Sequence, residues 1–200
     1  ELSLQEFETT KYLEELLTEY GYEIISNIGG NGFAAILKNG GNKTVLFRAD
    51  MDALPVKEET DITFKSKKTT KQNGIDVPVM HACGHDIHMT SLIGTAEYFS
   101  KNKDSWEGTI VFILQPAEEI GFGARQMIGA GLFEKIPYPD INLALHVSAQ
   151  TQSGTVHITP GFAMANVDSV DVTFYGEGGH GAYPHLTKDP IVMSSQFITA

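Results

Sequence analysis

Three apolar runs, at residues 44–47, 109–114 and 141–145, constrain the fold of this chain more than any other feature. Short apolar runs of this kind are typical of strands that are buried on both faces of a sheet. Segments with helical spacing follow two of them, at residues 89–99 and 124–133. Strands that alternate with helices predict an α/β fold with a mostly parallel central sheet flanked by helices.

The start of the chain predicts a helix followed by a hairpin. Ser3 and Glu6 have the spacing of a capping box, and the helical pattern after them ends at Gly21. Residues 22–28 and 32–38 then predict two strands joined by a turn.

Acidic and histidine side chains follow each of the three apolar runs. Asp50 and Asp52 come after the first run, Glu118 and Glu119 after the second, and His146 after the third. Ligands of open α/β sheets bind at the carboxyl ends of the strands. We therefore expect these side chains to gather at one edge of the sheet.

Residues 80–88 hold the only cysteine of the chain and three of its seven histidines. The segment around Cys83 and His85 indicates a metal site, because thiolate sulfur and imidazole nitrogen are ligands that a borderline-soft divalent ion prefers. Gly84 between them allows the two side chains to turn toward one point.

Other interpretations of this segment stay open. Cys83 could be a small buried apolar residue, as most lone cysteines are. It could also be a nucleophile with His85 as its base. His81 and His88 could be ordinary polar groups at the surface.

The adjacent acids Glu118 and Glu119 are the second informative feature. Adjacent acids repel each other, so a tight site that holds both needs compensating positive charge. One carboxylate can bind a cation while the other moves protons as a general base. The alternative is a solvated acidic turn. Together Cys83, His85, Glu119 and His146 offer more ligands than one catalytic ion needs and few for two ions.

The pattern changes in the last fifth of the chain. Residues 167–175 alternate between apolar and polar, which is typical of a half-exposed strand in an antiparallel sheet. A glycine-rich connection, residues 176–185, leads to a predicted helix that begins at Pro190. We place a domain boundary near residues 161–165. Because the chain has no initiator methionine and ends without a capping signal, we interpret it as a segment of a longer protein.

Composition limits the partners and the compartment. The formal charge of −11 argues against nucleic acid or an anionic membrane surface as a partner. No apolar run is long enough to span a bilayer. A single cysteine excludes an internal disulfide framework and fits a reducing cytoplasm, which is the location we expect. The polar residues 57–79 indicate a solvated loop or flap.

Five motifs together are specific for one family, although no single motif would be. The chain resembles the metal-dependent amidohydrolases related to aminoacylase. Within them it is similar to the branch of hippurate hydrolases, auxin-conjugate hydrolases and N-acetyl-diaminopimelate deacetylases. The motifs lie at residues 47–55, 81–86, 115–119, 144–146 and 178–185.

The resemblance implies a two-metal catalytic domain with a smaller α+β lid that mediates dimerisation. Residues 1–163 would be the N-terminal part of the catalytic domain, and residues 164–200 the beginning of the lid. Zinc is the expected metal, with manganese, nickel or cobalt as alternatives. Cys83 would lie between the two ions. The further ligands implied by motif position are His85, Glu119 and His146.

Three more roles follow from the resemblance. Glu118 matches the general base, Asp52 an aspartate that supports the metal ligands, and His180 a lid histidine that stabilises the oxyanion, often across the dimer. The last metal-ligand histidine of the family has no counterpart among these residues, and we expect a segment without it to bind metal poorly.

The implied activity is hydrolysis of the amide bond in an N-acyl amino acid or related small conjugate. Glu118 would deprotonate the metal-bound water that attacks the acyl carbon. A metallopeptidase of the dipeptidase or carboxypeptidase type, acting on short peptides, shares these residues and is the alternative. A structural metal site or an assembly module is an alternative of another class, but a closed site needs no unligated acid such as Glu118.

Overall fold

The computed structural model describes residues 1–200 and divides them into two compact units, Glu1–Gln150 and Thr151–Ala200. The first unit contains a central sheet, and the second contains one helix of ten residues, α5 (Pro190–Thr199). The proposal that a lid domain begins near residue 164 stays a prediction. No helix is both long and apolar enough to cross a membrane.

The first unit is built on a mixed five-stranded sheet with the strand order β1-β2-β6-β3-β7. β6, β3 and β7 are parallel, whereas β1 and β2 join β6 through antiparallel pairs. The α/β class is confirmed, and the sheet is mixed because the predicted hairpin adds its two strands beside the parallel ones. The strands are β1 (Glu23–Ile25), β2 (Phe33–Asn39), β3 (Thr44–Asp50), β6 (Gly108–Gln115) and β7 (Ile141–Ala144).

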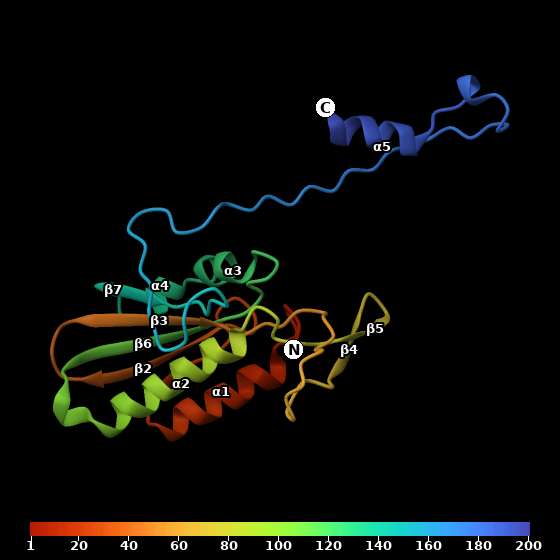
Figure 1. Ribbon diagram of the computed structural model, residues 1–200. Coiled ribbons are helices and arrows are strands. Elements are labelled where there is room, and N and C mark those ends of the chain that lie inside the picture. The colour runs from red at the N-terminus through yellow and green to blue at the C-terminus, as the bar shows by residue number, and fades with distance from the viewer. The chain divides into compact units, whose positions relative to one another are not determined.

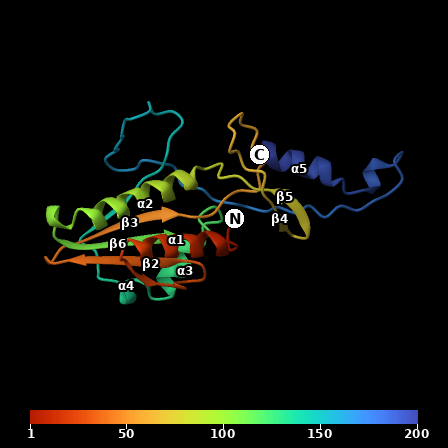
Figure 2. The same cartoon turned by 90° about the horizontal axis from the view of Figure 1, so that it is seen from below.

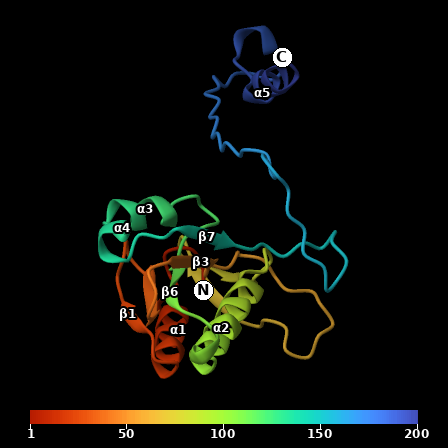
Figure 3. The same ribbon diagram turned by 90° about the vertical axis from the view of Figure 1, so that its left-hand side faces the viewer.

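Helices cover both faces of this sheet (Figures 1 and 3). α1 (Phe7–Glu19) and α2 (His85–Lys101) lie side by side over one face (Figure 2), and α3 (Gly123–Gly129) and α4 (Leu132–Lys135) lie over the other. β6 is buried on both sides, since Phe112 packs toward α1 and α2 while its neighbours pack toward α3 and α4. The apolar run at residues 109–114 is explained by this central position.

Two regions of the first unit differ from the sequence-based expectation. Residues 57–79 contain a two-stranded hairpin of β4 (Thr69–Gln72) and β5 (Ile75–Pro78) instead of a loop alone. The single helix predicted at residues 124–133 is divided into α3 and α4. The division falls near Gly131, whose φ of +79° cannot continue a right-handed helix.

The predicted capping box at the start of α1 is wrong. The hydroxyl of Ser3 donates to Asp52 Oδ2 at 2.7 Å, and the side chain of Glu6 is fully buried. α1 begins only at Phe7 and has no side-chain cap. Neither side chain caps the helix: Ser3 binds Asp52, and Glu6 accepts from Asn31 and Ala117 as well as from the backbone of Leu4.

Of the elements predicted for the second unit, the helix is present and the strand is not. α5 is capped by Asp189, whose carboxylate accepts from the backbone N–H of Ile191 at 2.9 Å. Residues 167–175 are not a strand, and the one bridge of this unit joins Glu177 to Lys188. An alternating segment needs a partner strand to satisfy its backbone groups, and none of residues 1–200 supplies one to residues 167–175.

Candidate metal centre

The polar residues predicted at the strand ends do gather at the carboxyl edge of β3, β6 and β7. Asp50 ends β3, His85 begins α2, and the acids Glu118 and Glu119 lie in the turn after β6. His146 follows β7 by two residues. Parallel neighbours bring these ends to one edge of the sheet, so residues distant in sequence meet there.

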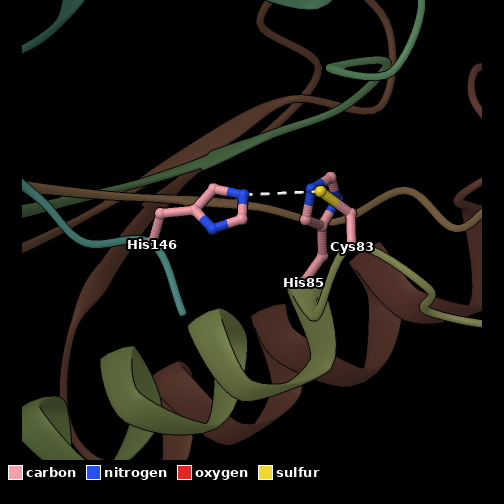
Figure 4. A group of neighbouring side chains, drawn as sticks. All are labelled: Cys83, His85 and His146. Carbon is pink, nitrogen blue, oxygen red and sulfur yellow. Dashed lines mark hydrogen bonds between the residues drawn. The ribbon is translucent and has the colours of Figure 1, made fainter. Parts of the chain in front are cut away.

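Three groups of potential ligand atoms, each group within 4.8 Å, share His85. One group is Cys83, His85 and His146, which Figure 4 shows converging from the turn before α2, the first turn of α2 and the segment after β7. A second joins His85 to Glu118 and Glu119. The structure therefore brings the other three sequence-predicted ligands, and Glu118, around His85. The third group consists of Asp50, His85 and His88.

The ring of His85 is held in one tautomer. Its Nδ1 lies 2.7 Å from the backbone carbonyl oxygen of Asp52, and a carbonyl only accepts, so Nδ1 carries the proton. His85 is completely buried, and its Nε2 has no hydrogen-bond partner. Metal-binding histidines usually donate their second nitrogen in this way, which leaves the first one free for the ion.

The free nitrogen of His85 faces oxygen atoms of three carboxylates. Nε2 lies 3.6 Å from Asp50 Oδ2 and 3.8 Å from both Glu118 Oε2 and Glu119 Oε1. These separations are too long for hydrogen bonds. Glu119 Oε1 is buried without a partner as well. A nitrogen lone pair and carboxylate oxygens at this distance repel each other unless positive charge lies between them.

The pKa values of the site report the same shortage of positive charge. Burial lowers the pKa of His85, but the hydrogen bond to Asp52 and the charge of Asp50 outweigh it, and the net pKa is raised. Burial raises the pKa of Glu119, and the neighbouring Glu118 charge adds to the effect. Both shifts favour the protonated form of the residue, in the place where a cation would supply the positive charge.

His146 repeats the arrangement of His85. Its Nδ1 lies 2.7 Å from the carbonyl oxygen of Val147, so Nδ1 donates and Nε2 is the acceptor nitrogen. Nε2 lies 3.4 Å from Cys83 Sγ (Figure 4). A sulfur and a nitrogen bound to one tetrahedral zinc ion lie about 3.5 Å apart, given Zn–S of about 2.3 Å and Zn–N of about 2.0–2.1 Å. The donor set and the spacing therefore fit a divalent ion.

Asp52 and Asp50 hold the frame of the site as carboxylates. Burial opposes the ionisation of Asp52, but hydrogen bonds from His85, Ser3 and the backbone of Glu119 lower its pKa to about 2. Burial likewise opposes the ionisation of Asp50, and the hydrogen bond from His88 with the charge of Arg48 lowers its pKa.

His88 is a site residue whose role was missed in the sequence. It is buried, its Nδ1 lies 2.6 Å from Asp50 Oδ1, and its Nε2 accepts from the backbone N–H of Val147 at 3.0 Å. With both nitrogens occupied, His88 supports the residue beside His146 and offers no free lone pair to an ion. Its position three residues after His85 places both rings on one face of α2, which is the signal that could have found it.

His180 lies in the second unit. It is exposed, and its Nδ1 accepts from the backbone N–H of Ala182 at 3.1 Å. Its ring also packs near Tyr183, with the ring centres 5.4 Å apart. Its relation to the metal centre stays a prediction.

The fold and the centre define an α/β domain with a candidate two-metal cluster at the carboxyl edge of its sheet. Residues 46–196 match the model of peptidase family M20/M25/M40, and the chain belongs to that family.

Relatives and a solved structure agree with this assignment. The chain is 42% identical over 205 residues to thermostable carboxypeptidase 2 of Saccharolobus solfataricus. That alignment covers 100% of this chain and 49% of the relative. The chain is 40% identical over 201 residues to hippurate hydrolase of Campylobacter jejuni, covering 100% and 50%. A Bacillus subtilis structure described as a dinuclear metal binding peptidase of the M20 family matches with a TM-score of 0.65 and 37% identity, over 75% of this chain and 39% of that one. The chain spans about half the length of the curated relatives it matches.

The lowered pKa of Asp52 predicts a specific dependence of stability on pH in chelator-treated protein. The folded pKa of about 2 lies below the ordinary 3.8, so the carboxylate stabilises the fold above about pH 4 and loses this effect as the pH falls to 2. At 1.36 kcal/mol per pKa unit the contribution is roughly 2 kcal/mol. The free energy of unfolding of Asp52→Asn, measured with urea, should therefore be lower than that of wild type at pH 5. This difference should shrink by roughly 2 kcal/mol between pH 5 and pH 2.

The exposed Asp104, changed to Asn, is the matched control for this measurement and should show no such change. A difference in the free energy of unfolding between Asp52→Asn and wild type that stays constant from pH 5 to pH 2 would contradict the lowered pKa of Asp52.

Proposed function

We propose that the full-length protein hydrolyses the amide bond of N-acyl amino acids or related small conjugates, with two divalent ions held at this centre. One observation carries the proposal. Two histidines have their Nδ1 atoms tied to backbone carbonyls, and their Nε2 atoms converge with Cys83 Sγ. The Nε2 atom of His85, which has no hydrogen-bond partner, also faces the unpaired Oε1 atom of Glu119. Zinc is the metal that this set of sulfur, nitrogen and oxygen donors favours, with manganese, nickel or cobalt as alternatives.

The residues of the centre divide into ligands and a base. Cys83, His85, Glu119 and His146 would hold the ions. The chemistry that divalent ions supply in such a site is polarisation of the amide carbonyl and a lowered pKa of the attacking water. Glu118 would accept the proton of that water and deliver it to the leaving nitrogen.

The two adjacent acids differ in a way that supports this division. The side chain of Glu118 is 40% exposed and that of Glu119 is 17% exposed. A base must reach water and substrate, whereas a ligand can be buried against the ion. Asp52 would hold the ring of His85 and the backbone of Glu119 in place, as their hydrogen bonds with it indicate.

A cysteine nucleophile is the alternative that the geometry itself raises, because Cys83 Sγ lies 3.4 Å from His146 Nε2. A nucleophile needs a thiolate, which positive surroundings favour. Here burial raises the pKa of Cys83, and the charges of Glu119 and Glu118 raise it further. The thiol would ionise readily only once a cation is present, which favours the metal-dependent reaction.

The relatives support the bond type more than the substrate. Hippurate is an N-acylated amino acid, and a carboxypeptidase also cleaves an amide bond, so the hippurate hydrolase and carboxypeptidase relatives point to one reaction on two kinds of substrate. We propose the N-acyl amino acid as the main substrate and the short peptide as the alternative. A cytoplasmic location and a homodimer formed through the lid complete the proposal.

Exchanging each acid for its amide should separate the two roles. Glu119→Gln should lower the metal content of the purified protein, because a ligand is lost. Glu118→Gln should keep its metal while kcat falls by about 10²–10⁴-fold, because only the proton transfer is removed. Elemental analysis and steady-state assays on a panel of N-acyl amino acids would measure both effects.

The control for this pair is Glu107→Gln, at an exposed glutamate outside the site, which should behave as wild type. Equal loss of metal in both site variants would show that the division into ligand and base is wrong. Full activity after verified removal of all metal would exclude the metal-dependent reaction.

His180 provides a test of the lid. If it stabilises the developing oxyanion, His180→Ala should lower kcat by about 10²–10³-fold with the metal content unchanged. The exposed His157, changed to Ala, is the control. Mixing His180→Ala with Glu118→Gln should restore part of the activity if the residue acts across the dimer, because hybrid dimers hold one complete site. No recovery, with subunit exchange verified, would exclude action across the dimer.

A further inference from the structure

Glu6 is a fully buried acid that has no part in the proposed chemistry. Its Oε1 accepts from the backbone N–H of Leu4 at 3.0 Å and from that of Ala117 at 2.8 Å. Its Oε2 accepts from Asn31 Nδ2 at 2.8 Å. A carboxylate is an acceptor at both oxygens, so it matches these three donors without a conflict.

The contact with Ala117 fixes the turn that carries the two adjacent acids. Ala117 precedes Glu118, is fully buried and has a φ of +48°, in the left-handed region that is strained for a residue with a Cβ. Its carbonyl accepts from the N–H groups of Phe122 and Gly123 at 3.1 Å. Without Glu6, the N–H of this strained residue would be a buried donor with no partner.

The same N-terminal segment also supports the turn through Asp52. Ser3 donates to Asp52 Oδ2 at 2.7 Å, and that oxygen also accepts from the backbone N–H of Glu119 at 3.0 Å. Residues 3–6 therefore stabilise the turn that carries Glu118 and Glu119 at two points. Glu6 binds the backbone of Ala117, and Ser3 binds Asp52, which in turn binds the backbone of Glu119.

We propose that Glu6 is a positioning residue for the metal centre: its buried carboxylate holds the strained turn at Ala117 so that Glu118 and Glu119 face His85. The expected effect of Glu6 on kcat rests on the proposed function, whereas the expected effects of Glu6 on metal affinity and on the order of the turn do not. Glu6 touches neither metal ligand atoms nor substrate, and acts through the backbone of Ala117.

Two substitutions in the full-length protein separate the hydrogen bond from the volume of the side chain. Glu6→Gln keeps one oxygen for the N–H groups of Leu4 and Ala117, and its amide nitrogen can donate to Asn31 once the Asn31 amide turns over. Glu6→Leu fills a similar volume but offers no acceptor. Leu17→Ala, at a fully buried position of α1, is the control for lost stability without any change at the turn.

Three measurements are made on folded protein. Zinc affinity comes from competition with a chromogenic chelator, kcat and KM from hydrolysis of an N-acyl amino acid, and hydrogen exchange of the peptide 115–123 from the metal-free protein. We expect Glu6→Leu to weaken zinc affinity and to lower kcat by about 10–100-fold each, with a small change in KM and faster exchange in that peptide. Glu6→Gln should recover most of these losses, and Leu17→Ala should show none.

The result that would overturn the proposal is a folded Glu6→Leu protein with wild-type zinc affinity and exchange, or a Leu17→Ala protein with equal losses. If Glu6→Leu does not fold, Glu6→Ser, which leaves room for a water beside Ala117, takes its place with the same criteria. Wild-type protein that hydrolyses no N-acyl amino acid would contradict the proposed function alone, because zinc affinity and exchange still report on Glu6.

Discussion

The structure of the centre depends on the repulsion among the acceptor atoms around His85 Nε2. Three carboxylate oxygens lie within 3.8 Å of this nitrogen, while Nδ1 of the same ring is committed to the Asp52 carbonyl. Such an arrangement is costly in a buried site unless a cation joins the atoms. The surrounding contacts hold the acceptors against this repulsion: Arg48 pairs with Asp50 at 2.7 Å, and Asp50 in turn binds His88. The apolar core on both faces of β6 keeps the strand ends from separating.

Much of the fold and of the ligand set could be predicted from the sequence because both depend on local patterns. The apolar runs located β3, β6 and β7, and the rule that ligands bind at the carboxyl ends of parallel strands predicted that Glu118, Glu119 and His146 lie at one edge of the sheet. Cys83 and His85 were predicted from the local sequence of residues 80–88 and from the family resemblance, and the structure brings them to His146. The hairpin at residues 69–78 was missed because its residues are polar and mostly exposed, so no alternation of buried positions marks it.

The supports of the site could not be predicted, and the reason is physical. Glu6 meets Ala117 across 111 residues and His88 meets Val147 across 59, and a hydrophobic pattern specifies burial but not which polar partners meet. The spacing of Ser3 and Glu6 even favoured a helix cap, because local capping and long-range hydrogen bonding demand the same residue types. The strand expected at residues 167–175 is absent for a related reason. The alternation of apolar and polar residues predicts which side chains would be buried. It does not supply the neighbouring strand with which the backbone must form hydrogen bonds.

The central claim is that Cys83, together with histidine nitrogens, binds a divalent ion, and X-ray absorption at the zinc edge tests it most directly. The measurement is made on full-length protein loaded with zinc, beside the variant Cys83→Ser. The account predicts a sulfur scatterer at about 2.3 Å with nitrogen or oxygen scatterers at about 2.0–2.2 Å in the wild type, and loss of the sulfur contribution in the variant. A wild-type spectrum with nitrogen and oxygen scatterers alone, or a sulfur signal that survives in Cys83→Ser, would contradict it.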